Sequence, residues 1–376
     1  MKTILYPITL FAAIAHRSVA LSNRLKPWCE ASIEYSRANE YVRAHYSLNK
    51  HYDDDSYFPC STSQTEPIYN AREGYWDGQS DSFVTPSLKT CGFMLCSGFR
   101  NVIDEQHDTV SRNTVEHCFL PQIRPLIRHQ GYAGANISHM IFWNPVARSK
   151  DAAQTRPDET SVLPTGGYAG LPHIDIDVGA YRNASQLFSV VEKNRMCQDE
   201  PLDRQDVLSR LDNGSRFAIV NAWINLDPYN PVMDDPLAFL ATRYRQQRPF
   251  PHSRPDMTQS RWYTYPAMTH SEVLLFCQYD RDDRAPSDLW HCAIQPNLSG
   301  ARQQQSTRRP RISFDVRCFV MLDETVDATH DRFRTDRVRA KLSLTESRAF
   351  CSQQSAQLRS ITNNSTTILR TSSIYL

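Results

Sequence analysis

The chain has 376 residues, of which 42 are basic and 41 are acidic, so its formal net charge at pH 7 is +1. This balance argues against a nucleic-acid partner, because nucleic-acid-binding proteins usually carry a basic excess or a basic stripe. The 12 glycines form no GxGxxG, GxxxxGK[ST] or GxSxG motif, so the usual support for nucleotide-dependent enzymes and serine hydrolases is missing.

The first residues resemble a secretory signal peptide. Lys2 precedes an apolar run over 4–15 and a small-residue site at 18–20, and we therefore expect residues 1–20 to be a candidate signal peptide. The secretory pathway and the cytoplasm both stay open as locations. The run is too short for a confident membrane span, and no other stretch approaches that length, so we expect no stable membrane span.

The ten cysteines contain no CxxC pair, which argues against zinc ribbons and thioredoxin chemistry. In a secreted chain, the group from Cys29 to Cys118 could form disulfides.

In chain order, we expect an irregular N-terminal arm over 21–80, because this region is polar and acidic in places. A strand is predicted over 89–96. A helix is predicted over 110–127, where apolar residues recur at helical spacing. A second strand over 139–143 is predicted to end at the Asn-Pro pair that follows it.

The remaining elements are mostly short strands. A polar loop over 151–170 precedes a predicted strand over 173–178 and a helix over about 184–192. Further strands are predicted over 217–224, 262–265, 273–279 and 311–321, with a Pro- and Asp-rich break over 227–236 and a loop or lid over 243–260. Many short strands between turn signals predict a mainly β domain with flanking helices, a barrel or sandwich over 81–335. Residues 336–376 are Ser/Thr-rich and are predicted to be a tail.

One short segment combines two metal-ligand types. His173 and Asp175 lie two residues apart, and in a strand such residues point to the same face, so both can reach one ion. Asp177 shares that face and competes for the ligand role. An exposed strand with a polar face gives the same sequence pattern, so this spacing alone is weak evidence for a metal site.

His291 is the candidate third ligand. It follows a strand-like run and an acidic loop, and its alternative role is a hydrogen-bonded core histidine, since the chain has 12 histidines. Two imidazoles and one carboxylate on one face of a metal leave positions open for a cosubstrate and dioxygen, which is typical of iron(II) oxygenases.

The strand that begins at Arg311 is predicted to bind an anion. Arg311, Ser313, Asp315 and Arg317 alternate with apolar residues. A guanidinium binds a carboxylate through two hydrogen bonds and a nearby hydroxyl adds a third, as the distal carboxylate of 2-oxoglutarate requires. Arg317 is the alternative anchor, or it pairs with Asp315. An edge strand with paired surface charges would give the same alternation.

Four segments resemble the fungal hydroxylase/desaturase family, which includes gibberellin desaturase and relatives of the small cephem-methoxylase subunit. They are RFAIVNAW at 216–223, MDDPLA at 233–238, RWY at 261–263 and EVLLFCQYD at 272–280. The resemblance covers about 85–325 and implies a double-stranded β-helix of the jelly-roll or cupin-like kind.

The same resemblance implies a chemistry. It makes His173, Asp175 and His291 the iron(II) ligands, and Arg311 with Ser313 the 2-oxoglutarate anchor. The enzyme would use dioxygen to hydroxylate, desaturate or cyclise a small-molecule secondary metabolite.

Two other interpretations stay open. One is a secreted, disulfide-stapled β-sandwich binding protein without redox activity. The other is a cupin-like protein that binds zinc or a metabolite without oxidising it. No pattern in the sequence indicates an oligomeric state.

Overall fold

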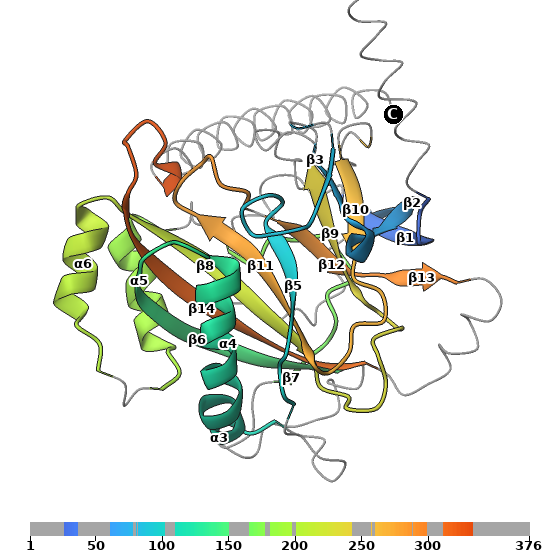
Figure 1. The fold of residues 1–376 in the computed structure, drawn as a ribbon, viewed down its shortest axis with the longest axis horizontal. Helices are drawn as coiled ribbons and strands as arrows, with labels where there is room; N and C mark the ends of the chain where they lie inside the picture. The colour runs from blue at the N-terminus through green and yellow to red at the C-terminus, as the bar shows by residue number, and fades with distance from the viewer. Residues whose placement is uncertain are drawn as a thin grey trace, which may run out of the picture.

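The computed structural model describes residues 26–36, 61–77, 80, 82–101, 110–149, 165–176, 181–197, 201–242, 257, 260–287, 289–298 and 311–333. Its core is a pair of six-stranded β-sheets (Figure 1). The first, here called the large sheet, has the strand order β5 (Phe93–Ser97), β11 (Glu272–Asp280), β8 (Ser215–Asn225), β14 (Ile312–Thr325), β6 (Ile137–Ser149) and β7 (Thr165–Gly166).

The second sheet is built from shorter strands. Its order is β12 (Trp290–Ala293), β9 (Leu237–Thr242), β10 (Ser260–Thr264), β2 (Ser61–Asn70), β1 (Cys29–Ser36) and β13 (Gln295–Asn297). A 3-10 turn, η2 (Ala71–Glu73), leads to a separate two-stranded ribbon of β3 (Tyr75–Asp77) and β4 (Ser82–Val84). The prediction of an irregular arm over 21–80 was therefore wrong where the structure describes it, because β1 and β2 pair over eight residues in the second sheet.

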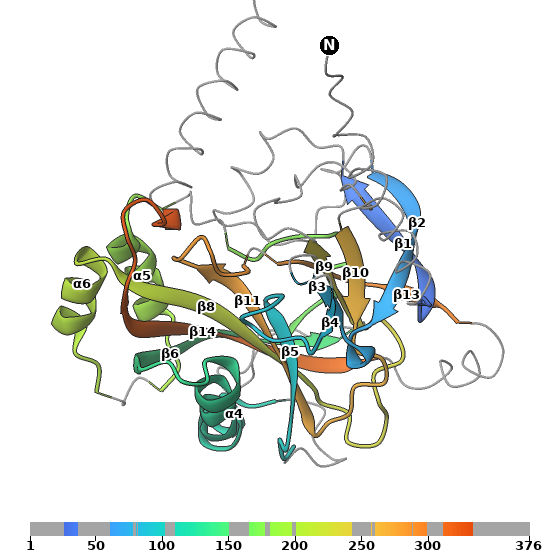
Figure 2. The ribbon, with the colours of Figure 1, turned by 45° about the horizontal axis from the view of Figure 1, so that its top comes forward.

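The chain alternates between the two sheets. From β8 it crosses to β9 and β10, returns for β11, crosses again for β12 and β13, and returns for β14. This alternation is the topology of a jelly roll, or double-stranded β-helix. The predicted fold class is thus confirmed: the protein is mainly β, with helices on the flanks of the large sheet (Figure 2).

One helical segment covers the outer face of the large sheet. It runs without a break through α3 (Arg112–Thr114), η3 (Val115–Phe119), α4 (Leu120–Leu126) and η4 (Ile127–Gly131), as the helix predicted over 110–127 required. Its buried residues pack against Phe314, Val316 and Cys318 of β14. These residues alternate along the strand, so the residues between them face the other way, toward the interior.

Two further helices cover one end of the inner face. They are α5 (Ala184–Lys193), which confirms the predicted helix, and α6 (Arg204–Asp212), which was not predicted. Phe188 of α5 and Val207 of α6 pack in one apolar cluster with Phe217 of β8 and Phe319 of β14. This end of the sheet is therefore closed by helices, as both views show (Figures 1 and 2).

Farther along the inner face the two sheets pack on each other. Trp223 of β8 and Phe276 of β11 share an apolar cluster with Phe239 of β9 and Tyr263 of β10. Between this cluster and the one beneath α5 and α6, the inner face carries polar residues. That polar band lies inside the protein, and it holds the site described below.

Two predicted strands differ from the structure. β6 does not end at Asn144 and Pro145; it continues to Ser149, and the pair forms a bulge in which Asn144 has a positive φ of 50°. Asn tolerates this conformation and the bulge absorbs the proline, which cannot donate to the ladder. The strand predicted over 173–178 is also absent from residues 173–176, where only His173 forms a β-bridge.

Eight cysteines lie within the described residues, and all eight are free thiols. The structure therefore contradicts the prediction of disulfides for those cysteines of the Cys29–Cys118 group that it describes. Burial raises the pKa of the Cys96 thiol to about 12 and raises the pKa of Cys292 and Cys318 as well, so these thiols pack as small apolar groups.

In the part of the chain that the structure describes, no helix is both long and apolar enough to cross a membrane. The candidate signal peptide over 1–20, the C-terminal tail over 336–376, and Asp177 lie outside the described residues, as does most of the predicted lid over 243–260.

Candidate metal centre

The two candidate histidine ligands are joined through their backbones. The amide of His173 donates to the carbonyl of His291 at 3.1 Å, and the amide of His291 donates back at 3.1 Å. Residues that exchange both hydrogen bonds stand directly opposite each other, with their side chains on one face. The two imidazole rings accordingly lie 4.3 Å apart between centroids.

Both rings are oriented in the same way. Nδ1 of His173 lies 2.9 Å from the carbonyl of Leu171, and Nδ1 of His291 lies 3.1 Å from the carbonyl of Leu289. A carbonyl can only accept, so each Nδ1 carries the proton. Each Nε2 of a neutral ring then keeps its lone pair, which is the arrangement of metal-ligating histidines.

The charge state of His291 supports this assignment. Burial, together with the neighbouring His173, lowers the pKa of His291 to about 3. The ring is therefore neutral at physiological pH and can serve as a ligand.

Asp175 completes the group. Its Oδ1 lies 3.3 Å from Nε2 of His173, and its Oδ2 lies 3.9 Å from Nε2 of His291. One ligand atom from each of the three residues lies within 4.8 Å of the others, so the group could hold a metal ion. The structure thus brings together the three predicted side chains, although they come from a bridge and a strand 118 positions apart.

Three adjacent strands of the large sheet hold Asp175 from behind. Asn221 of β8 donates from Nδ2 to Asp175 Oδ2 at 2.7 Å, and Gln278 of β11 accepts from the Asp175 amide at 3.2 Å. Arg317 of β14 places Nη2 3.5 Å from Asp175 Oδ1. Arg317 and Asn221 are direct cross-strand partners, so these contacts come from a continuous row across the sheet.

The balance of charges keeps Asp175 ionised. Burial alone would raise the pKa of its carboxyl, but the Arg317 guanidinium beside it holds that pKa well below its usual range. An anionic oxygen is what a divalent cation requires of a carboxylate ligand.

Gln278 reaches the site because β11 bulges at that residue. The pairing with β8 shifts between Cys277 and Tyr279, so Gln278 is the extra residue. Bulges often redirect a side chain in this way.

Sequence reasoning missed Asn221 and Gln278. The available signal was a lone amide inside an apolar strand run, in RFAIVNAW and in VLLFCQY. A buried side-chain amide requires hydrogen-bond partners, so an Asn or Gln within an apolar strand indicates a polar site in the core.

The predicted anion anchor is also buried. Ser313 is fully buried and its hydroxyl has no hydrogen-bond partner in the structure, and Arg311 Nε likewise has none. The Arg311 guanidinium lies 4.0 Å from the ring centroid of Tyr168 and 5.3 Å from that of Trp223, and it donates to the carbonyl of Asp235. Burial lowers the pKa of Arg311 to about 10, which leaves it charged at neutral pH.

The structure separates Arg317 from that anchor. Arg317 faces Asp175 and lies 5.5 Å from the ring centroid of Trp143, whereas Asp315 pairs with Arg148 at 2.8 Å. The suggested pairing of Arg317 with Asp315 is therefore wrong. The expected alternative of an exposed edge strand does not apply, because β14 lies between β8 and β6 in the large sheet. Ser313, Asp315 and Arg317 point inward from it.

Comparisons with known proteins were made for sequence and for structure. No curated protein sequence matches the chain. Among solved structures, the chain is similar to an iron and alpha-ketoglutarate-dependent endoperoxidase, NvfI, captured with a different conformation, at 20% identity and a TM-score of 0.49 over 79% of this chain and 98% of that one. A second structure of the same endoperoxidase gives 20% identity and a TM-score of 0.46 over 78% and 98% of the two chains.

A family match covers most of the folded region. It extends over residues 60–321, which is more than half of the chain, and it includes His173, Asp175, His291, Arg311, Ser313 and Arg317. The protein that carries this site therefore belongs to the family described as the oxidoreductase/YMDC permease-like domain.

Proposed function

We propose that the protein is a non-haem iron(II)/2-oxoglutarate-dependent dioxygenase that hydroxylates, desaturates or cyclises a small-molecule secondary metabolite. The observation that carries this proposal is the convergence of two imidazoles, one of them the neutral ring of His291, and one carboxylate on a single point inside the barrel. This donor set, with positions left open, suits iron(II) in oxygenases.

The donor atoms fit a metal ion of that size. An ion about 2.1 Å from each ligand holds neighbouring ligand atoms about 3 Å apart. The separations of 3.3 and 3.9 Å are only slightly wider than this. His173, Asp175 and His291 would hold the ion, and both Nδ1–H groups are fixed by backbone carbonyls, which sets the orientation of the rings.

The pair formed by Arg311 and Ser313 fits one carboxylate of the cosubstrate. The hydroxyl and Nε are buried donors without partners, and leaving such groups unpaired costs free energy. A carboxylate would accept from both groups and neutralise the guanidinium. The stacking of Arg311 on Tyr168 would keep the guanidinium in place for that contact.

When bound, the iron supplies the redox chemistry: dioxygen oxidises 2-oxoglutarate to succinate and carbon dioxide and oxidises a C–H bond of the substrate. The protein's own residues orient the ligands, bind the cosubstrate and exclude water. Exclusion of water is favoured here because apolar clusters border the polar band on both sides.

The strands quoted above for their resemblance to fungal hydroxylases and desaturases support the finer assignment to that group. Those strands are β8, β10 and β11, and in the structure they form the wall behind Asp175 and the core beside it. The substrate would then be a secondary metabolite with an oxidisable C–H bond.

The deciding experiment is an anaerobic titration of the purified protein with iron(II) and then 2-oxoglutarate. We expect a weak visible charge-transfer band that needs both additions, and succinate formation coupled to product once oxygen and a substrate are supplied. His291→Ala should abolish both signals. His330→Ala is the matched control, because His330 contacts Asp283 at the surface, outside the site. Full coupled turnover in His291→Ala would refute the proposal.

The same donor set also suits zinc, so a metal-binding protein without oxidase activity is the second candidate. Metal analysis of the protein as purified, followed by oxygen uptake with and without 2-oxoglutarate, separates the two functions. The buried donors of Arg311 and Ser313 favour the dioxygenase, because a zinc-binding protein has no need of an anion slot there. The eight free cysteines weigh against the disulfide-stapled binding protein.

A further inference from the structure

Arg317 occupies an unusual place for a cation. Its guanidinium lies 3.5 Å from Asp175 Oδ1, the same oxygen that lies 3.3 Å from His173 Nε2. Among the described residues, Asp175 is the one carboxylate within 4.0 Å of this guanidinium, because Asp315 is engaged by Arg148. Arg317 therefore neutralises the charge that a metal ion would use.

We propose that Arg317 is a place-holding cation that competes with a divalent metal ion for Asp175 and thereby couples metal binding to the binding of an acidic ligand. The inference rests on the metal-binding function proposed above, and it adds a role for a residue outside the ligand set and outside the Arg311 anchor.

The competition follows from charge. A divalent ion held by Asp175 Oδ1 would lie close to the guanidinium, and like charges at such distances repel strongly in a site with little water. The Arg317 side chain is only 15% exposed, so solvent screens it poorly. Binding of the metal must therefore overcome both the repulsion and the loss of the Arg317–Asp175 pair.

The coupling follows from the donors that Arg317 has left. Its Nε is buried without a hydrogen-bond partner, and its guanidinium lies 5.5 Å from the Trp143 ring centroid. Once a metal takes the charge of Asp175, this cation lacks a counter-ion. An anion bound beside the metal would supply one and would remove the repulsion, so the anion and the metal should each strengthen the binding of the other.

Arg311 cannot serve this purpose from its own position. It precedes Arg317 by six residues along an extended strand, which is about 20 Å. Arg311 contacts Tyr168 and Asp235, whereas Arg317 contacts Asp175. The two arginines therefore face different parts of the interior.

The test measures manganese(II) binding to the full-length protein by electron paramagnetic resonance, with and without 2-oxoglutarate. Manganese(II) replaces iron so that binding is read without turnover. The variants are Arg317→Gln, which removes the charge, and Arg317→Lys, which keeps it. Arg204→Gln is the matched control, because it removes one positive charge that pairs with Glu192 near the surface and leaves Asp315 paired with Arg148.

We expect Arg317→Gln to bind manganese(II) at least about tenfold more tightly than the wild type when 2-oxoglutarate is absent. Arg317→Lys and Arg204→Gln should stay within about threefold of the wild type. Added 2-oxoglutarate should tighten manganese(II) binding in the wild type more than in Arg317→Gln. Equal or weaker metal affinity in a folded Arg317→Gln variant, judged by circular dichroism, would overturn the inference.

The result is distinguishable from failure of the proposed function. If the wild type binds manganese(II) but forms no succinate with iron, the dioxygenase proposal fails, while the affinity ratio between wild type and Arg317→Gln still decides the role of Arg317. If only Arg317→Gln binds the metal, the competition is supported. If neither protein binds it, the inference falls.

Discussion

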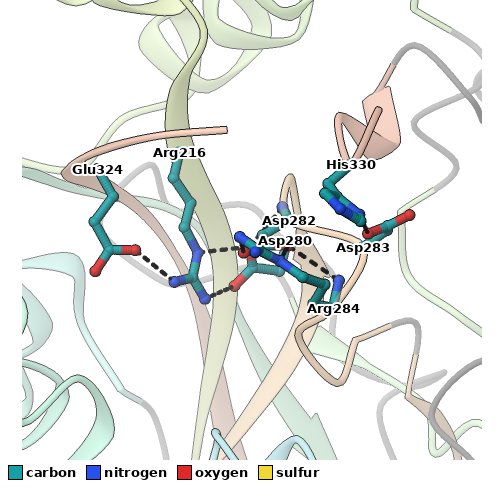
Figure 3. A network of polar contacts seen from close by, with 7 residues as sticks. All are labelled: Arg216, Asp280, Asp282, Asp283, Arg284, Glu324 and His330. Carbon is teal, nitrogen blue, oxygen red and sulfur yellow. Dashed lines mark hydrogen bonds and ion pairs between the residues drawn. The ribbon is translucent and has the colours of Figure 1, made fainter. Parts of the chain in front are cut away.

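The strands β8, β11 and β14 carry polar groups at two places, and the two places differ in how well those groups are paired. At the end nearest α6, Arg216 donates to Asp280 at 3.0 and 2.8 Å and to Glu324 at 2.8 Å (Figure 3). Nearby, Asp282 binds Arg284, and His330 contacts Asp283.

The middle of the same strands is organised differently. Asn221 uses its amide nitrogen on Asp175, but its Oδ1 has no partner. The same is true of Gln278 Nε2, Arg317 Nε and Ser313 Oγ. These atoms are buried, and buried polar atoms in native proteins are normally paired.

This difference in hydrogen-bond pairing distinguishes a structural cluster from a binding site within one sheet. A closed network rigidifies the fold, because each charge already has its counter-charge. An open network stores unsatisfied donors and acceptors that a ligand can satisfy. Substitutions at the first place should therefore change stability alone, and substitutions at the second should change ligand binding.

The largest expected effect comes from the closed end. Arg281 and Asp331 form a bidentate pair at 3.1 and 2.7 Å, with side chains 5% and 3% exposed. Asp331→Asn leaves a buried guanidinium without its counter-charge, which should cost about 3–5 kcal/mol in the free energy of unfolding. Urea denaturation measures it, and the exposed pair Arg204–Glu192 provides the control, since Glu192→Gln should cost about 0.5 kcal/mol or less.

A second measurement on Asp331→Asn tests whether the two places in the sheet have separate roles. Manganese(II) affinity of the folded variant should equal that of the wild type, because Arg281 joins Asp331 to the carbonyls of Leu211 and Ser215, at the end of the sheet that α6 covers. A large loss of metal affinity without loss of stability would break the distinction between the two places.

The next largest effect is expected at the anchor. Arg311→Met removes the cation while keeping a side chain that can pack between Tyr168 and Trp223. The concentration of 2-oxoglutarate at half-saturation should rise by about a hundredfold, in line with the loss of a buried charge pair. Titration of the visible band under anaerobic conditions measures it. An unchanged half-saturation value would assign the anchor to another residue.

The smallest effect is the most diagnostic. Ser313→Ala removes a buried hydroxyl that has no partner in the free protein. The half-saturating 2-oxoglutarate concentration should rise by about tenfold, while the free energy of unfolding should stay level or rise by about 1 kcal/mol.

Ser287→Ala is the matched control for this prediction. Its hydroxyl is likewise buried without a partner, but it belongs to the loop before β12 and not to the strand of the anchor. It should reproduce the effect of Ser313→Ala on stability and leave 2-oxoglutarate binding unchanged. Destabilisation by Ser313→Ala of more than about 1 kcal/mol would place its hydroxyl among the structural groups instead.

Several strands of the large sheet could be located along the sequence because β-prone runs and turn residues mark them. The helix over 110–127 and the strands around 217–224 and 273–279 appear where periodicity predicts them. The ligand candidates were also accessible, since their types and order are local facts of the sequence.

The features that could not be predicted from the sequence depend on contacts between distant segments. β1 does carry a strand pattern, because the buried residues Cys29, Ala31, Ile33 and Tyr35 alternate with polar ones, and the sequence prediction missed it. The pairing of β1 with the more polar β2 follows from the sheet that both strands join. His173 is extended because it pairs with His291 and not because its own segment forms a strand. The contact between Arg317 and Asp175 joins residues 142 positions apart, so no local pattern indicates it.

The backbone bridge between His173 and His291 has a consequence for how the protein acquires its site. The two imidazoles meet only where the chain that leads into β8 closes against β12, after a loop of more than a hundred residues has been folded. Until that long-range closure happens, His173 and Asp175 lack their third ligand, so the complete centre cannot capture iron and generate oxidants in a half-folded chain.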